Sequence, residues 1–267
     1  FYKINGATVG EAYRAEAKAV REKGGIIDVS TLGKIDVQGP DAGIFLDKLY
    51  TNRISNLRLG RGRYGLMLRE DGRIFDDGVV FRTGEDRFHL SCTTGGASAV
   101  YQHIEYALQV LWPSLEVYVT PVTEEWFAVA VSGPRARDLL SALFPDLDVT
   151  NSALPLMGML ETTLFDRRLL VMRISYSGEL SYEINISADW GAALWRRLSE
   201  LASELEMIAY GTEAMGALRI EKGHITHAEA DGRTTPDDVG LGILVDKKKD
   251  AIGVRSLSLP VFSETGR

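Results

Sequence analysis

One pattern of residues occurs twice in this chain, and the second copy follows the first by 94 residues. The dipeptide Gly39-Pro40, for example, recurs as Gly133-Pro134. Three separate segments keep the register, and the other paired positions are Val37 and Val131, Ala42 and Ala136, Leu46 and Leu140, Leu49 and Leu143, Gly84 and Gly178, Glu85 and Glu179, Phe88 and Tyr182, Ala99 and Ala193, Tyr101 and Trp195, and Ile104 and Leu198. Such a repeat predicts an internal duplication of strand–helix–hairpin–helix units. We therefore expect two similar halves, residues 1–118 and 119–212, and a C-terminal extension over residues 213–267.

The local pattern predicts where the elements of these halves lie. A high content of Ala, Glu, Lys and Arg indicates a surface helix over residues 11–22, and apolar residues at helical spacing indicate helices over residues 101–111 and 192–205. Residues 217–222 are also expected to be helical. Gly24-Gly25 ends the first of these, and Gly39-Pro40 opens another, since proline is favoured in a first helical turn. The run Lys247-Lys248-Lys249 is typical of a solvated surface.

Residues 63–80, RYGLMLREDGRIFDDGVV, read as a β-hairpin with its turn at Asp71-Gly72. Two carboxylates, Asp76 and Asp77, interrupt its second apolar run. Successive side chains of a strand point to opposite faces, so one of the two is expected to face inward. Either a bulge or strand end keeps both in water, or one carboxylate lines a pocket for a cationic or N–H-bearing ligand.

The two halves differ at charged positions. Asp76 corresponds to Leu170, and His89 corresponds to Glu183, so each half supplies its own acid. Duplicated folds often bind a ligand between halves that contribute different groups, and this is the arrangement we expect.

Composition excludes several classes of protein. A net charge of −7 argues against nonspecific binding of nucleic acid, and no apolar run approaches the roughly 20 residues of a membrane span. The single Cys92 excludes an internal disulfide framework and fits a reducing, cytoplasmic compartment. With one cysteine and four scattered histidines, a structural zinc site is not expected. The one G-x-G-x-x-G pattern, GRGRYG at residues 60–65, runs into the predicted hairpin and does not open a helix, so it does not read as nucleotide-binding. Any flavin or NAD should therefore sit in other domains or subunits.

Four segments resemble the folate-binding aminomethyltransferase family, which includes the T-protein of glycine cleavage. They are residues 27–30, the hairpin that ends at Asp77, residues 176–184 and residues 218–223. Within this family the sequence resembles the C-terminal half of the alpha subunits of heterotetrameric sarcosine oxidases. The longest matching stretches are DVSTLGKIDVQGPDA at 28–42, RYGLMLREDGRIFDDGV at 63–79, TEAMGALRIEKG at 212–223 and DKKKDAIGVRSL at 246–257.

The resemblance implies an α+β fold of two swapped, duplicated β-α-β-α-type subdomains around a folate site. It implies an enzyme module in which an N-methyl carbon, oxidised at a flavin elsewhere in the complex, passes to tetrahydrofolate. The products would be 5,10-methylenetetrahydrofolate and glycine, and the partners would be other sarcosine oxidase-type subunits or flavin-bearing domains. The family also has a C-terminal barrel after the equivalent of Ser256-Leu257, and we expect that barrel to be missing here.

By position, the resemblance makes Asp76 the catalytic carboxylate and Tyr64, Tyr176 and Glu183 the folate-binding residues. A carboxylate can stabilise a developing cation and accept a proton, and a glutamate can accept two N–H groups of an aminopyrimidine. Tyrosines offer a flat apolar face and one hydroxyl. From the residues alone, Glu183 also reads as an ordinary outward strand residue, Tyr64 as core, and Tyr176 as turn packing.

One departure from the family and two other functions stay open at this point. T-proteins usually carry Arg-Asp where this chain has Met215-Gly216, so a folate contact of that arginine cannot be carried over. A stand-alone aminomethyltransferase acting on a lipoyl carrier protein is one alternative. A folate-binding or scaffold module without efficient chemistry is the other.

Overall fold

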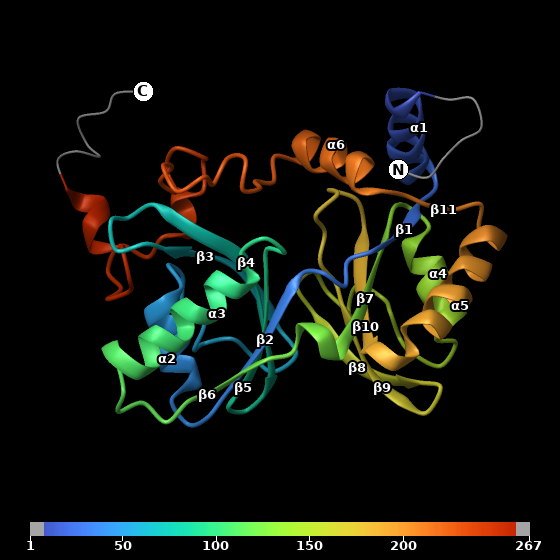
Figure 1. Cartoon of the computed structure of the whole chain (residues 1–267). Coiled ribbons are helices and arrows are strands. Elements are labelled where there is room, and N and C mark those ends of the chain that lie inside the picture. The colour runs from blue at the N-terminus through green and yellow to red at the C-terminus, as the bar shows by residue number, and fades with distance from the viewer. Residues whose placement is uncertain (1–7, 260–267) are drawn as a thin grey trace. The chain divides into compact units, whose positions relative to one another are not determined.

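The computed structural model describes residues 8–259, which form two compact units, each built around one sheet (Figure 1). Unit 1 contains the chain up to Ser30 together with Glu124–His224, and unit 2 contains Thr31–Thr123 together with the chain from Ile225 onward. Both helices and strands occur in each unit, so the α+β class is confirmed. None of the described helices is long and apolar enough to cross a membrane.

Unit 1 has a six-stranded sheet in the order β11-β1-β7-β10-β9-β8. All neighbours in it are antiparallel except β1 and β11. Helices α4 and α5 lie along one face and bury the main apolar cluster, while α1 and α6 pack on β1 and β7 from the other face (Figure 1). The elements are α1 (Val9–Glu22), β1 (Gly25–Asp28), β7 (Trp126–Ser132), α4 (Ala136–Leu143), β8 (Met159–Leu164), β9 (Arg167–Met172), β10 (Ser181–Ser187), α5 (Gly191–Glu204), β11 (Ile208–Ala209) and α6 (Thr212–Lys222).

Unit 2 has a five-stranded antiparallel sheet in the order β3-β4-β5-β2-β6. Helices α2 and α3 cover one face, and residues 225–257 pack on the other face of the β3–β4 hairpin. The elements are β2 (Gly33–Gln38), α2 (Ala42–Leu49), β3 (Gly62–Leu68), β4 (Ile74–Gly84), β5 (Arg87–Cys92), α3 (Ala97–Tyr106), a π-helical turn (Ala107–Leu111) and β6 (Tyr118–Pro121).

The elements of the two units follow each other at the spacing of the sequence repeat. Both ends of α4 lie 94 residues after those of α2, and α5 begins 94 residues after α3. Gly39 and Gly133 both adopt positive φ, 133° and 115°, and each lies against other backbone. At Gly39 a Cβ would come within 2.2 Å of the Glu116 carbonyl oxygen. The recurring Gly-Pro pair therefore has a steric reason at its glycine.

Two strands are exchanged between these otherwise matching sheets. β1 precedes β2 in sequence but pairs with β7, and β6 precedes β7 but pairs with β2. Each compact unit is consequently assembled from two separate stretches of chain. The ranges 1–118, 119–212 and 213–267 divide the sequence into consecutive pieces, and this division stays a prediction about the repeat.

The predictions differ from the structure at three places. The helix expected over 217–222 begins five residues earlier, at Thr212. The helix expected over 101–111 begins earlier, at Ala97, and its last turn is π-helical from Ala107. Lys249, expected in a solvated run, is buried: its side chain is 6% exposed, and its ammonium donates hydrogen bonds to the carbonyl oxygens of Tyr50 and Asn52. The carbonyls of that turn need a donor, which outweighs the tendency of a lysine to stay in water.

Candidate functional site

Asp76 is a buried carboxylate in the middle of the unit 2 sheet. It lies on β4, where Met67 is its partner on β3, and the register shifts just beyond this pair so that Phe75 is the extra residue of a bulge. The residue is only 2% exposed, while neighbouring Asp77 is half-buried. The expectation that one of the two faces inward holds. The bulge is present as well, but it does not leave Asp76 in water.

Thr93, at the end of β5, holds the Asp76 carboxylate with two hydrogen bonds. Its hydroxyl donates to Asp76 Oδ1 over 2.7 Å, and its backbone N–H donates to Oδ2 over 3.3 Å. Gly96 completes this turn before α3, and its N–H donates to Thr93 Oγ1 over 3.2 Å. A Cβ at Gly96 would lie 2.6 Å from Thr93 Oγ1 and 2.9 Å from Asp76 Oδ2. The carboxylate can therefore sit here only because position 96 has no side chain.

Burial acts on both aspartates. It raises the pKa of Asp76, against the hydrogen bonds from Thr93 and the nearby His227, which favour the ionised form. Burial also raises the pKa of Asp77 to about 6, and the charge of Asp76 adds to that increase. A carboxyl group whose pKa is raised towards neutrality can exchange a proton under ordinary conditions.

Tyr64 contacts Asp77 rather than Asp76. Its hydroxyl donates to Asp77 Oδ2 over 2.8 Å, and its ring packs beside the apolar cluster of Leu66 and Leu68. Alternation along the hairpin puts this pair on one face of the sheet and Asp76 on the other. The polar contact goes beyond simple core packing for Tyr64.

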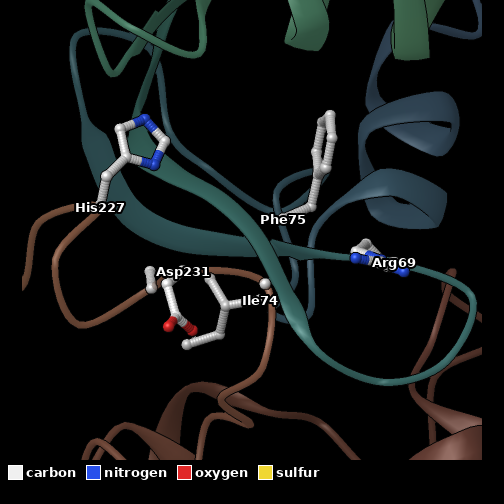
Figure 2. Close-up of a pocket in the computed structure, with 7 residues that line it drawn as sticks. Arg69, Ile74, Phe75, His227 and Asp231 are labelled. Atoms are coloured by element: carbon white, nitrogen blue, oxygen red, sulfur yellow. The ribbon is translucent and has the colours of Figure 1, made fainter.

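A hollow lies beside this hairpin, with a volume of about 500 Å³. It is bounded by the start of β4, by Arg69 in the turn between β3 and β4, and by the segment that begins the second stretch of unit 2. Figure 2 shows these side chains. The lining residues are Arg69, Ile74, Phe75, His227, Ala230, Asp231 and Gly232. His227 connects the hollow to the aspartate, because its Nε2 lies 2.8 Å from Thr93 Oγ1.

Glu183 lies on β10 of unit 1, on the face opposite the main core. Its neighbours Tyr182 and Ile184 point into the cluster under α4 and α5, so Glu183 points to the other face. Directly across from it lie Ala130 on β7 and Met172 on β9.

Tyr176 of unit 1 is half of an aromatic stack. The rings of Tyr176 and His224 lie 5.5 Å apart between centroids and are inclined by 20°. Burial lowers the pKa of His224, which favours the neutral imidazole. Tyr176 is thus held with one face against His224, which is more than the turn packing that its sequence context suggested.

The predicted residues fall into two pairs, with Tyr64 and Asp76 in unit 2 and Tyr176 and Glu183 in unit 1. Within unit 2, Asp76 contacts Thr93, and Tyr64 contacts Asp77. The sequence reasoning missed Thr93, Gly96 and His227. Thr93-Thr94-Gly95-Gly96 at a strand end was a visible turn signal, but nothing local indicated that His227, more than 130 residues later, would reach it.

This chain is similar to known proteins both in sequence and in fold. Residues 1–249 match the family described as the GCVT N-terminal domain. The alpha subunit of sarcosine oxidase from Corynebacterium sp. (strain U-96) is 45% identical over 97% of this chain, and the chain spans 27% of that relative's length. An aminomethyltransferase from Halothermothrix orenii is 31% identical over 91% of this chain and 66% of its own length.

A solved structure has the same fold. The glycine cleavage system aminomethyltransferase T from Bartonella henselae superposes with a TM-score of 0.80 and 26% identity. The superposition covers 91% of this chain and 64% of that protein. The sequence resemblance and the fold therefore agree.

Proposed function

Because this chain belongs to the GCVT N-terminal domain family, we propose that it is a tetrahydrofolate-binding module for one-carbon transfer. In its finer form the proposal is that the module serves a sarcosine oxidase-type enzyme. There it passes the oxidised N-methyl carbon of sarcosine to tetrahydrofolate, which gives 5,10-methylenetetrahydrofolate and glycine. The similarity to sarcosine oxidase alpha subunits, at 45% identity, favours this form.

The observation that carries the proposal is the buried carboxylate of Asp76. Burying a carboxylate is energetically costly, and Asp76 is only 2% exposed, so we infer that its burial serves function. Two hydrogen bonds from Thr93 fix the position of the carboxylate. Tetrahydrofolate supplies the nucleophilic amines that take up the carbon. Asp76 would stabilise the positive charge that develops at the transferred carbon and would accept the proton released from the amine.

Glu183, Tyr176 and Tyr64 would hold the folate. A glutamate carboxylate such as that of Glu183 can accept two parallel N–H groups from an aminopyrimidine edge. The Tyr176 ring, supported by His224, offers a flat apolar surface, and the Tyr64 hydroxyl offers a polar contact. This donor and acceptor set suits a reduced pterin.

The partners that we propose are subunits or domains bearing flavin and NAD, because the one G-x-G-x-x-G pattern, at residues 60–65, runs into strand β3 instead of opening a helix. The lone Cys92 suits a reducing compartment, and we propose the cytoplasm. We also propose that the matching helix bounds and strand orders of the two units come from duplication of one ancestral unit.

A second candidate function is aminomethyl transfer from a lipoyl carrier protein, as the similarity to an aminomethyltransferase suggests. The two functions differ in their donor. The test is a product assay on the intact enzyme that contains this chain, with sarcosine, in the presence and absence of tetrahydrofolate. We expect formaldehyde without tetrahydrofolate and methylenetetrahydrofolate with it. Unchanged formaldehyde release in saturating tetrahydrofolate would reject the sarcosine form, and activity with an aminomethyl-lipoyl donor would support the second candidate.

A further inference from the structure

The Thr93 hydroxyl has three polar neighbours. Asp76 Oδ1 lies 2.7 Å from Thr93 Oγ1, His227 Nε2 lies 2.8 Å from it, and the Gly96 nitrogen lies 3.2 Å from it. A hydroxyl has one hydrogen to donate and two lone pairs that accept. Three neighbours therefore use its full capacity, and each must take a defined role.

These roles can be assigned from the chemistry of the neighbours. The Gly96 N–H can only donate, so it occupies one lone pair of Thr93 Oγ1. An ionised Asp76 can only accept, so it takes the hydroxyl hydrogen. His227 must then donate through Nε2–H to the second lone pair. If Nε2 carried no hydrogen, two acceptors would compete for one hydrogen, and one contact under 3 Å would be repulsive.

The same three atoms allow a second arrangement. When Asp76 is protonated, its O–H can donate to Thr93 Oγ1, and the Thr93 hydroxyl then donates to a bare His227 Nε2. Passing from this arrangement to the first breaks the Asp76 O–H and Thr93 O–H bonds and forms new Thr93 O–H and His227 N–H bonds. One proton leaves Asp76, and one arrives at His227. No oxidant or other reactant is needed.

We propose that Thr93 and His227 form a proton path that connects the buried Asp76 carboxylate with solvent. This inference rests on the proposed role of Asp76 as the group that accepts a proton during one-carbon transfer. Asp76 is 2% exposed and cannot release that proton directly to water, whereas His227 is exposed and lines the hollow beside the hairpin (Figure 2). Imidazole is the side chain best suited to exchange protons near neutral pH. Thr93 and His227 act through Asp76, so they serve the catalytic group without touching the reacting carbon.

The surroundings of His227 are compatible with the release of a proton to solvent. Its ring lies over Gly95, where a Cβ would be 3.6 Å from Nε2, an ordinary contact. The charged groups that face it are Asp76 and Asp77 from β4 and, around the hollow, Arg69 and Asp231. Because His227 is exposed, its replacement should leave the fold intact.

The test uses the intact enzyme with sarcosine and tetrahydrofolate, and measures the rate of methylenetetrahydrofolate formation in single turnovers and in repeated turnovers. His227→Ala should slow repeated turnover by at least about tenfold, which is below the 10²–10⁴-fold range for direct acid–base groups because water can replace it in part. Added imidazole should restore this variant. Thr93→Val should be slow as well, and imidazole should not restore it.

His227→Gln separates a proton path from simple positioning. Glutamine can still donate a hydrogen bond to Thr93, but it cannot take up and release a proton at neutral pH. We expect it to be as slow as His227→Ala. Wild-type turnover in His227→Gln or in His227→Ala, or no restoration of His227→Ala by imidazole, would overturn the proton path. If Asp76→Asn itself forms methylenetetrahydrofolate at the wild-type rate, the failure lies instead in the proposed function.

Discussion

The sheets of units 1 and 2 share one strand order, apart from the additional strand β11 in unit 1, but β4 and its counterpart β9 carry different side chains. In unit 2, β4 carries Asp76 and Asp77. In unit 1, the pairing of β9 with β10 places the exposed Arg167 and Arg168 level with these two residues, and the buried part of β9 is apolar. The comparison indicates that a strand at this place in the fold does not need a buried carboxylate, which is costly to bury.

A cross-strand pair next to the core also differs between the two units. In unit 2, His89 and Asp36 lie opposite each other on β5 and β2, and His89 Nδ1 is 2.7 Å from Asp36 Oδ1. In unit 1 the equivalent pair is Glu183 and Ala130. Unit 2 thus has a hydrogen-bonded cross-strand pair where unit 1 has an acid opposite an alanine. The proposed folate-binding acid, Glu183, lies at a position where the two repeats differ.

The largest effect that we expect comes from Asp76→Asn, which removes the charge that unit 1 lacks. Transfer to tetrahydrofolate should slow by roughly 10²–10³-fold, or about 2–4 kcal/mol, as for loss of one preorganised electrostatic group. Oxidation of sarcosine should continue, so the intact enzyme would release formaldehyde. The measurement is the yield of each product with tetrahydrofolate present.

A matched control for that variant is Asp86→Asn, at an exposed turn of the same unit. Asp77→Asn is not suitable, since Asp77 is half-buried and accepts a hydrogen bond from Tyr64. Equal yields of methylenetetrahydrofolate from wild type and Asp76→Asn would mean that the carboxylate is structural, and the contrast between the units would lose its functional meaning.

Asp77→Asn should make unit 2 more stable and so more like unit 1. The folded-state pKa of Asp77 is raised from 3.8 to about 6, so the folded protein binds more protons than the unfolded chain between these values. The stability that Asp77 contributes is therefore present below pH 4 and lost as the pH rises through 6. At pH 7 the variant should gain up to about 3 kcal/mol over wild type. Urea unfolding at several pH values measures this, and a gain that is the same at pH 4 and pH 7 would contradict it.

Gly96→Ala should disturb the aspartate site without changing its charges. The new Cβ would meet Thr93 Oγ1 at 2.6 Å and Asp76 Oδ2 at 2.9 Å, and overpacking of this kind costs about 1–3 kcal/mol. Thermal unfolding and the rate of transfer should both show the loss. Gly216→Ala in α6 is the control, because no atom lies within 4 Å of its added Cβ. It should be stabilising by about 0.5–1 kcal/mol. Equal melting temperatures for wild type and Gly96→Ala would show that the turn can relax.

The cross-strand pairs include the smallest expected effect on stability, that of Glu183→Ala. Asp36→Ala removes the carboxylate that lies 2.7 Å from Nδ1 of the 4% exposed His89 and should destabilise the protein by about 1–3 kcal/mol. Glu183→Ala removes an acid whose proposed task is binding, so it should leave stability within about 0.5 kcal/mol and weaken tetrahydrofolate binding instead. Chemical unfolding and calorimetric titration measure the two. A larger loss of stability from Glu183→Ala would make that acid structural.

The sequence was informative wherever the signal was local. The hairpin of residues 63–80, α1 and α5 follow from spacing and from glycine stops. Strand alternation predicted that one of Asp76 and Asp77 faces inward, without saying which. The exchange of β1 and β6 could not be predicted in this way, because strand partners far apart in sequence leave no local mark. Lys249 was misplaced for the same reason, since its acceptors Tyr50 and Asn52 lie about 200 residues earlier.

The site was predictable only in part. The family resemblance pointed to Asp76. The alternation of the strand left open whether its carboxylate is exposed to solvent or buried. The contacts with Thr93 and His227 depend on the packing of the C-terminal segment onto the hairpin, which no spacing rule encodes. His227 is one of the four scattered histidines that argued against a metal site, and nothing in its sequence position indicated that it contacts Thr93.

Because unit 2 is built from two separate stretches of chain, its folding during synthesis on the ribosome must wait for the second stretch. Unit 2 begins at Thr31 and is completed only by the stretch after Ile225, so the whole second part of unit 1 is made in between. At 5–20 residues per second, those roughly 100 residues take about 5–20 s. During that interval the Leu66 and Leu68 face of the β3–β4 hairpin has not yet received its cover from residues 225–257. In a nascent chain of this protein, the apolar face of the hairpin thus stays uncovered for a longer time than it would in two domains that follow each other in sequence. Chaperones that bind exposed apolar segments could act on the chain during this interval.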